Sequence, residues 1–245
     1  MDTDGYRLFP PDPAVARWAE AARRAAIPLS RDPGHRAAQL RHGDSWFVGL
    51  DLLPNDDTGA VDGVPLAGPW QAWVPALPLH RAQLSIVYPG YPRQDAGDSD
   101  AQHRYRVNRA AAHVDGLLPV GPDRRRYAGE YHAYILGLPL TDCAAAPTVV
   151  WAGSHQIMQA ALQRAIGDAV PGSVDVTEAY QAARREVFAT CEQVALRPGV
   201  GGAMLLHRFA LHGTAPWGDP DMAPPEGRIT AFFRPETTPQ EWLAQ

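Results

Sequence analysis

The sequence predicts a mainly β protein with a jelly-roll fold (a cupin-like double-stranded β-helix) and flanking helices. Three observations support this prediction: many short strand-like runs, Gly- and Pro-rich turns between them, and only a few helical stretches. A length of 245 residues with 45% hydrophobic content suits one domain with a sizeable core. We therefore expect a single domain over residues 1–245.

The expected elements follow from residue periodicity. An Ala- and Arg-rich helix begins at a proline, and two further helices have apolar residues at helical spacing. The expected helices are 13–27, 155–166 and 177–191. The expected strands are 45–53, 83–88, 103–109, 130–138, 148–151, 193–196, 203–211 and 228–233. We expect residues 1–83 to pack on the core that the later strands form.

Bulk properties exclude several classes of partner. The net charge of -5 and the pI near 6.0 favour neither nucleic acid nor an anionic membrane as partner. Cys143 and Cys191 have the spacing of neither a disulfide framework nor a metal site. The acidic, polar N-terminus does not resemble a secretory signal, and no apolar run reaches the length of a membrane span. A cytoplasmic protein that acts on a small molecule is expected, and the sequence predicts no oligomeric state.

One short motif could hold a metal ion. His113 and Asp115 are two residues apart, so on an extended segment both side chains point to the same face. An imidazole and a carboxylate, completed by a second histidine from elsewhere, form the facial triad of non-haem Fe(II) oxygenases, which leaves coordination positions open. A His-x-Asp triplet alone is a weak signal, because such triplets arise by chance.

Three further elements follow this motif in the chain. They are Leu-His-Gly at 211–213, an arginine two residues before a threonine (Arg228 and Thr230), and Gly-Ser-His at 153–155. In their order and spacing, these elements resemble the phytanoyl-CoA dioxygenase family of Fe(II)/2-oxoglutarate-dependent oxygenases. The resemblance covers about residues 84–234.

The resemblance implies cofactors and roles. His113, Asp115 and His212 would bind Fe(II), and Arg228 would pair with the distal carboxylate of the co-substrate 2-oxoglutarate, beside Thr230. A planar, permanently charged guanidinium suits that task because it can bind a carboxylate through two hydrogen bonds. The protein would then hydroxylate a small organic substrate with O2 and release succinate and CO2.

Other residues compete for these roles. Arg234 is the rival to Arg228, but it precedes a proline near the end of the chain, where we expect fraying, so it ranks second. His207 would face away from His212 on a regular strand, so we interpret it as structural. His155 is as well explained by helix capping, and His132 as a histidine of the core or wall.

The substrate is the least defined part of the prediction. The candidates are Asn108, Arg109 and Trp217; on the expected strand 103–109, Arg109 faces the same side as the metal ligands. The arginines at 104–109 and 124–126 are either a solvated surface or a rim that attracts an anionic substrate.

Two other classes of protein stay open. One is a metal-dependent cupin-like enzyme that does not use 2-oxoglutarate, and the pair Arg228 and Thr230 argues against it. The other is a catalytically silent jelly-roll binding protein, which would have no reason to keep a complete set of three metal ligands.

Overall fold

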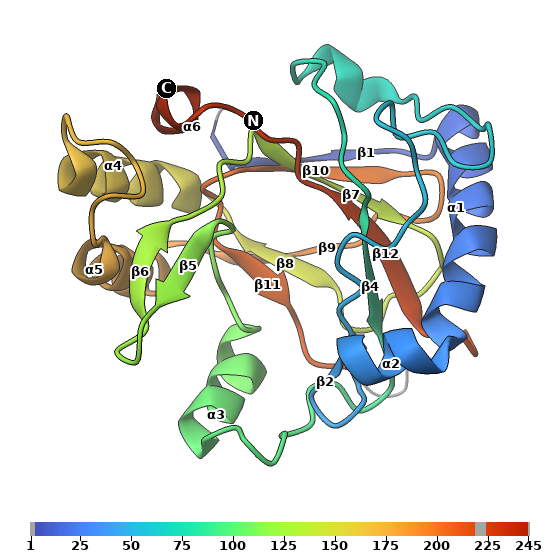
Figure 1. Ribbon diagram of the computed structural model, residues 1–245, viewed down its shortest axis with the longest axis horizontal. Coiled ribbons are helices and arrows are strands. Elements are labelled where there is room, and N and C mark those ends of the chain that lie inside the picture. The colour runs from blue at the N-terminus through green and yellow to red at the C-terminus, as the bar shows by residue number, and fades with distance from the viewer. Residues whose placement is uncertain (1–2, 219–223, 245) are drawn as a thin grey trace.

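Two antiparallel sheets form the centre of the computed structural model, which describes residues 3–218 and 224–244 (Figure 1). The large sheet contains β1 (Tyr6–Phe9), β2 (Leu40–Arg41), β3 (Trp46–Phe47), β4 (Gln83–Val87), β7 (Tyr134–Pro139), β10 (Ala203–His207) and β12 (Arg228–Phe233). Its strand order is β1-β10-β7-β12-β4-β3-β2. Neighbours in this sheet are far apart in the chain, so strands from both halves of the sequence build its centre.

The small sheet faces the inner side of the large one. It contains β8 (Thr148–Trp151), β9 (Gln193–Leu196) and β11 (His212–Thr214), in the order β11-β8-β9. A backbone bridge between His113 and His212 adds the segment around His113 to the other edge of β11. A separate hairpin of β5 (Leu117–Val120) and β6 (Arg125–Ala128) follows directly after that segment.

Six helices and one short 3-10 helix in the described residues surround the two sheets. They are α1 (Pro13–Arg31), α2 (Pro33–Gln39), α3 (Asp100–Arg109), α4 (Ser154–Ile166), α5 (Thr177–Thr190), α6 (Pro239–Leu243) and the short 3-10 helix η1 (Pro69–Ala72). Figure 1 shows α1 on one side of the molecule and α4 and α5 on the other. Trp18 of α1 packs against Phe233 of β12, with 5.8 Å between ring centroids. No helix in the described ranges is long and apolar enough to cross a membrane.

The alternation of side chains along β12 decides which residues face the space between the sheets. Ile229, Ala231 and Phe233 belong to the core under α1. Phe232 instead packs against the core between the sheets, which includes Val150 of the small sheet. Because side chains alternate along a strand, Arg228 and Thr230 share the inner face with Phe232.

Most of the expected elements are confirmed. The predictions at 148–151, 193–196 and 228–233 match β8, β9 and β12, and those at 83–88, 155–166 and 177–191 match β4, α4 and α5 to within one residue. The helix expected at 13–27 continues to Arg31, and the strand expected at 130–138 begins later, at Tyr134.

Three expected strands are wrong in whole or in part. Residues 103–109 belong to helix α3, and the Ser99 side chain caps its first turn. Because α3 buries no residue, its sequence has no apolar period that would indicate a helix. Of 45–53 only β3 is a strand, since Gly49 and Asp51 have positive φ angles. The run 203–211 ends as a strand at His207, and β11 begins anew at His212.

Gly213 is required where β11 meets the chain before His113. A Cβ atom at this position would lie 2.0 Å from the carbonyl oxygen of Ala110. We expect Gly213→Ala to destabilise the fold by about 1–3 kcal/mol, the usual cost of forcing extra atoms into a packed site. Chemical denaturation measures the change. Gly97→Ala is the control, because a Cβ there meets nothing within 4 Å; equal stability of the two variants would contradict the expectation.

Candidate metal centre

The backbone brings His113, Asp115 and His212 together. His113 and His212 exchange two backbone hydrogen bonds, with N···O distances of 2.8 and 3.1 Å, and their ring centroids lie 4.7 Å apart. Asp115 Oδ1 lies 3.1 Å from His113 Nε2, and Asp115 Oδ2 lies 3.7 Å from His212 Nε2. One potential ligand atom from each of the three residues falls within 4.8 Å of the others. This is a spacing that one metal ion can bridge.

Backbone carbonyl groups orient both histidine rings. His113 Nδ1 lies 3.0 Å from the carbonyl oxygen of Ala111, and His212 Nδ1 lies 2.9 Å from that of Ala210. A carbonyl oxygen only accepts, so in the neutral rings each Nδ1 carries the hydrogen and each Nε2 keeps a free lone pair. Metal-ligating histidines are held by contacts of this kind. Both free nitrogens face Asp115.

The electrostatics of the site keep its ligands ready for a cation. Burial raises the pKa of Asp115, but Arg234, His212 and His113 together hold that pKa well below its usual range. Burial lowers the pKa of His212 to about 4, so this ring is neutral at pH 7. Desolvation also lowers the pKa of His113, but the hydrogen bond and charge of Asp115 raise it by more. Metal binding therefore competes with a proton at His113 rather than at His212.

The donor set fits a divalent transition metal such as Fe(II). Two imidazole nitrogens and one carboxylate oxygen make a facial triad, which leaves positions for other ligands. The His113 side chain is 51% exposed, whereas Asp115 and His212 are 11% and 7% exposed. The group is thus buried at Asp115 and His212 and open to solvent beside His113.

Arg228 is a buried cation on the inner face of β12. Its side chain donates one hydrogen bond, from Nη2 to Thr148 Oγ1 at 3.0 Å, and it has no acidic partner within the described ranges. Burial lowers its pKa to about 10, so it stays charged at pH 7. A buried charge without a counter-ion is costly, and an anionic ligand between the sheets would relieve that cost. Thr230, two residues on, is also buried.

Arg234 also belongs to the metal centre, which the sequence argument did not anticipate. Its Nε donates to Asp115 Oδ2 at 2.5 Å, and its Nη1 donates to Gln83 Oε1 at 2.7 Å. The side chain is 18% exposed, so the expectation of a frayed chain end is wrong. The signal that could have revealed it is spacing: Arg234 lies six residues after Arg228, an even number that places both on one face of a strand.

The three predicted substrate residues lie in different environments. Asn108 is exposed on α3, and the Arg109 guanidinium lies 4.6 Å from the ring centroid of Phe188 in α5. The shared-face argument for Arg109 is wrong, because it assumed a strand. Trp217 packs beside Val87 and Tyr91. Contact of these residues with a substrate stays a prediction.

Two of the six arginines of the predicted anion-attracting rim are paired with acids. Arg106 binds both carboxylate oxygens of Asp98, at 2.6 and 3.0 Å. Arg125 binds Asp175 at 2.5 Å and Glu178 at 2.9 Å. These pairs neutralise the positive charge of Arg106 and Arg125, and the other rim arginines have no ion pair with an acid among the described residues.

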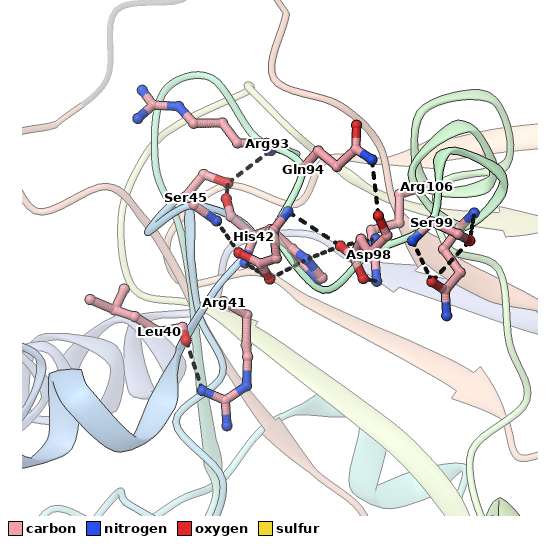
Figure 2. Close-up of polar contacts among 12 residues, drawn as sticks. Leu40, Arg41, His42, Ser45, Arg93, Gln94, Asp98, Ser99 and Arg106 are labelled. Carbon is pink, nitrogen blue, oxygen red and sulfur yellow. Dashed lines mark hydrogen bonds and ion pairs between the residues drawn. The ribbon is translucent and has the colours of Figure 1, made fainter. Parts of the chain in front are cut away.

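A second group of potential metal ligands, His42, Asp95 and Asp98, is better explained as a structural cluster (Figure 2). Asp98 is engaged by Arg106. Asp95 accepts the backbone N–H groups of His42 and Gly43 at 2.7 and 2.6 Å. Because their carboxylates already have partners, these residues join two loops beside the large sheet.

The remaining candidate histidines lie outside both groups. The rings of His207 and His155 have centroids 4.9 Å apart, and burial lowers the pKa of His207 to about 3. His207 Nδ1 accepts the backbone N–H of Phe209. These contacts agree with a structural role for His207.

Comparison with known proteins identifies the fold. No protein-family model and no curated protein matches the chain, so membership of the phytanoyl-CoA dioxygenase family stays a prediction. The structure resembles SnoK, a non-heme α-ketoglutarate-dependent carbocyclase from nogalamycin biosynthesis, with 14% identity, a TM-score of 0.51 and coverage of 94% of this chain and 79% of SnoK. This similarity shows a shared fold.

Two other solved structures match with lower scores. AviO1 from Streptomyces viridochromogenes Tue57 is 17% identical, with a TM-score of 0.47 over 96% of this chain and 90% of that protein. EctD from S. alaskensis, solved with 2-oxoglutarate and 5-hydroxyectoine, is 17% identical, with a TM-score of 0.45 over 95% and 72%.

Removal of any one ligand should weaken metal binding severely. We expect the affinity of His113→Ala, Asp115→Ala and His212→Ala for Fe(II) or Co(II) to fall by more than the about 10–100-fold loss that follows removal of a supporting group. Equilibrium dialysis measures the affinity, and thermal unfolding of the metal-free variants checks the fold. A variant of Asp115 that binds metal as tightly as the wild type would show that the ligand assignment is wrong.

Arg234 should support metal binding indirectly, by orienting Asp115. We expect Arg234→Gln to weaken Co(II) binding by about 10–100-fold, the range for groups that orient ligands. Arg104→Gln, on the exposed surface of α3, is the matched control and should bind Co(II) normally. If both variants bind Co(II) equally well, the contact with Asp115 has no role in metal affinity.

Proposed function

We propose that this protein is an Fe(II)- and 2-oxoglutarate-dependent oxygenase that hydroxylates a small organic substrate. The observation that carries the proposal is the buried, uncompensated guanidinium of Arg228, which lies between the same two sheets as the His113, Asp115 and His212 group. A dicarboxylate that reached from the metal to Arg228 would supply the missing negative charge.

The strand connections support a jelly roll of the double-stranded β-helix type. From β4 onward the chain passes repeatedly between the large and the small sheet, with the segment around His113 as the second strand; the exceptions are the separate β5–β6 hairpin and the consecutive strands β8 and β9, which both belong to the small sheet. Strands distant in sequence pair at the centre of each sheet: β12 with β4 and β7, and β11 with β8 and the His113 segment. Eight strands in two facing sheets are typical of this fold.

Each residue has a defined task in the proposed reaction. His113 and His212 would hold the metal through Nε2, and Asp115 through the carboxylate oxygen that Arg234 leaves free. When bound, Fe(II) and 2-oxoglutarate supply the oxidising chemistry with O2, and succinate and CO2 are released. Arg228 would bind the distal carboxylate through two hydrogen bonds, with Thr148 orienting the guanidinium and Thr230 beside it. The protein contributes position and electrostatics.

Succinate formation from 2-oxoglutarate tests the proposal directly. We expect succinate only with Fe(II) and O2 present, and none from His212→Ala. Fe(II) binding without consumption of 2-oxoglutarate would favour the cupin-like alternative. Absence of Fe(II) binding in the wild type would favour a silent binding protein.

Loss of Arg228 should act on 2-oxoglutarate and spare the metal. We expect Arg228→Ala to weaken 2-oxoglutarate binding by about 2–5 kcal/mol, the cost of losing one partner of a buried charge pair, while Co(II) affinity is retained. Arg228→Lys should restore binding only in part, because an ammonium lacks the planar fork. Titration of the Co(II) protein with 2-oxoglutarate measures both variants. If Arg234→Gln loses 2-oxoglutarate binding and Arg228→Ala keeps it, the two arginines have been assigned in the wrong order.

A further inference from the structure

The open side of the candidate metal centre lies at one edge of the two sheets. The large sheet runs from β10 through β7 and β12 to β4 and β3, and the small sheet runs from β9 through β8 and β11 to the His113 segment. Leu206 of β10 shares a core with Leu196 of β9. Arg228 of β12 binds Thr148 of β8. Both orders therefore run in the same direction, and the His113 segment faces β4 and β3.

Trp46 of β3 points into the space at this edge. Its neighbour Phe47 belongs to the core under α1, so the alternation of side chains along a strand turns Trp46 to the inner face. The indole Nε1 donates a hydrogen bond to Ser85 Oγ at 2.9 Å. Ser85 pairs with Thr230, two residues after Arg228. The indole therefore reaches past the level of Arg228 along the strand.

The level that the indole reaches is also the level of the metal ligands. In β8, Thr148 contacts Arg228, and Val150, two residues after it, pairs with His212. Strands β8 and β12 advance in the same direction from this contact, because the core between the sheets joins Val150 to β12. The metal ligands therefore lie two residues beyond Arg228, across the open edge from the Trp46 ring.

The Trp46 ring is held in place but stays half-buried. His42 stacks on it, with 5.7 Å between centroids and 8° between the ring planes, and Tyr91 meets it edge-on at 6.5 Å. Both of these neighbours are buried, whereas Trp46 is partly exposed. An indole has one hydrogen-bonding atom, the donor Nε1, and Ser85 already accepts it. What the ring offers to a ligand is therefore apolar carbon surface.

The charged groups beside His42 already have partners. Asp98 binds Arg106, and Asp95 accepts two backbone N–H groups (Figure 2). Burial and the charge of Arg106 lower the pKa of His42, so this ring is neutral at pH 7. Burial raises the pKa of Tyr91 to about 12, so its hydroxyl keeps its proton. These residues therefore present neither a free anion nor a free cation to a ligand.

We propose that Trp46 contacts the primary substrate and that the substrate presents a neutral, planar ring to the indole. The proposal rests on the oxygenase function proposed above. It separates the two ligands: Arg228 would bind the dicarboxylate, and the substrate would approach the metal from the open side beside His113, against Trp46. Aromatic rings associate by offset stacking or by edge-to-face contact, and the exposed part of the indole offers apolar surface for either.

Binding of three matched ring probes tests the proposal. They are benzyl alcohol, benzylamine and benzoate, each titrated by NMR into protein saturated with Co(II) and 2-oxoglutarate, which keeps benzoate from the Arg228 site. We expect benzyl alcohol to bind about tenfold more tightly than either charged probe, because no free charge at the indole offsets the loss of hydration of an ion. Paramagnetic Co(II) should broaden the resonances of the bound probe, and diamagnetic Zn(II) should not.

Variants of Trp46 test the contact itself. We expect Trp46→Leu to lose about tenfold in affinity for benzyl alcohol, the upper range for one aromatic pair, and Trp46→Phe, which keeps a ring, to lose less. Trp73→Leu is the matched control and should bind normally. Trp73 is partly exposed and lies against Arg7 of β1, at the opposite edge of the large sheet.

The possible outcomes separate this proposal from the oxygenase function. Equal or tighter binding of a charged probe, no binding of benzyl alcohol, binding without broadening by Co(II), or unchanged affinity in Trp46→Leu would overturn the assignment of Trp46. Failure of the wild type to bind Co(II) and 2-oxoglutarate would instead overturn the oxygenase function. Thermal unfolding and Co(II) affinity show whether Trp46→Leu is folded, and the more conservative Trp46→Phe provides a second measurement with a smaller loss expected.

Discussion

The pairing of two backbone segments at His113 and His212 is the constraint on which the site depends. Two hydrogen bonds join a stretch between α3 and β5 to a three-residue strand, and this places two imidazoles side by side. The pairing needs Gly213, where the backbone of Ala110 comes too close for any side chain, and Gly116, where a Cβ would meet the carbonyl of Glu130 at 2.3 Å. The three candidate metal ligands are therefore brought together by close backbone packing.

The burial of Arg228 costs the fold free energy. A fully desolvated charge lowers stability unless a partner offsets it, and among the described residues the hydrogen-bond partner of the Arg228 guanidinium is the Thr148 hydroxyl. The stability of the fold alone would favour an apolar residue at this position, as at Phe232 on the same inner face. Under the proposed function, an anion bound between the two sheets would offset the free energy that the burial of this cation costs.

Much of this arrangement could be predicted from the sequence, and the failures have physical causes. The short, largely apolar runs at β4, β8 and β12 and the helical spacing at α4 and α5 gave correct elements, because these strands and one face of each helix are buried. Helix α3 was missed because it buries nothing and is stabilised by capping, which leaves no apolar period. The role of Arg234 was missed because proximity to the chain end was weighed above strand register. Pairing of Arg125 with Asp175, 50 residues away, is tertiary, and no local pattern reveals it.

Strand β12 unites these observations, because a single register fixes the positions of both arginines. Its inner face carries Arg228 at one end and continues through Thr230 and Phe232 towards Arg234. At a rise of about 3.3 Å per residue, the two arginines are separated along the strand by roughly 20 Å. Under the proposed function, Arg228 would bind the dicarboxylate at one end of this length, and Arg234 binds Asp115 at the other. A shift of one residue in the pairing of β12 with β4 would move both arginines to the face that packs under α1. Burial of Ile229, Ala231 and Phe233 against α1 opposes that shift, so the same apolar residues that stabilise the fold also hold the two guanidinium groups in register.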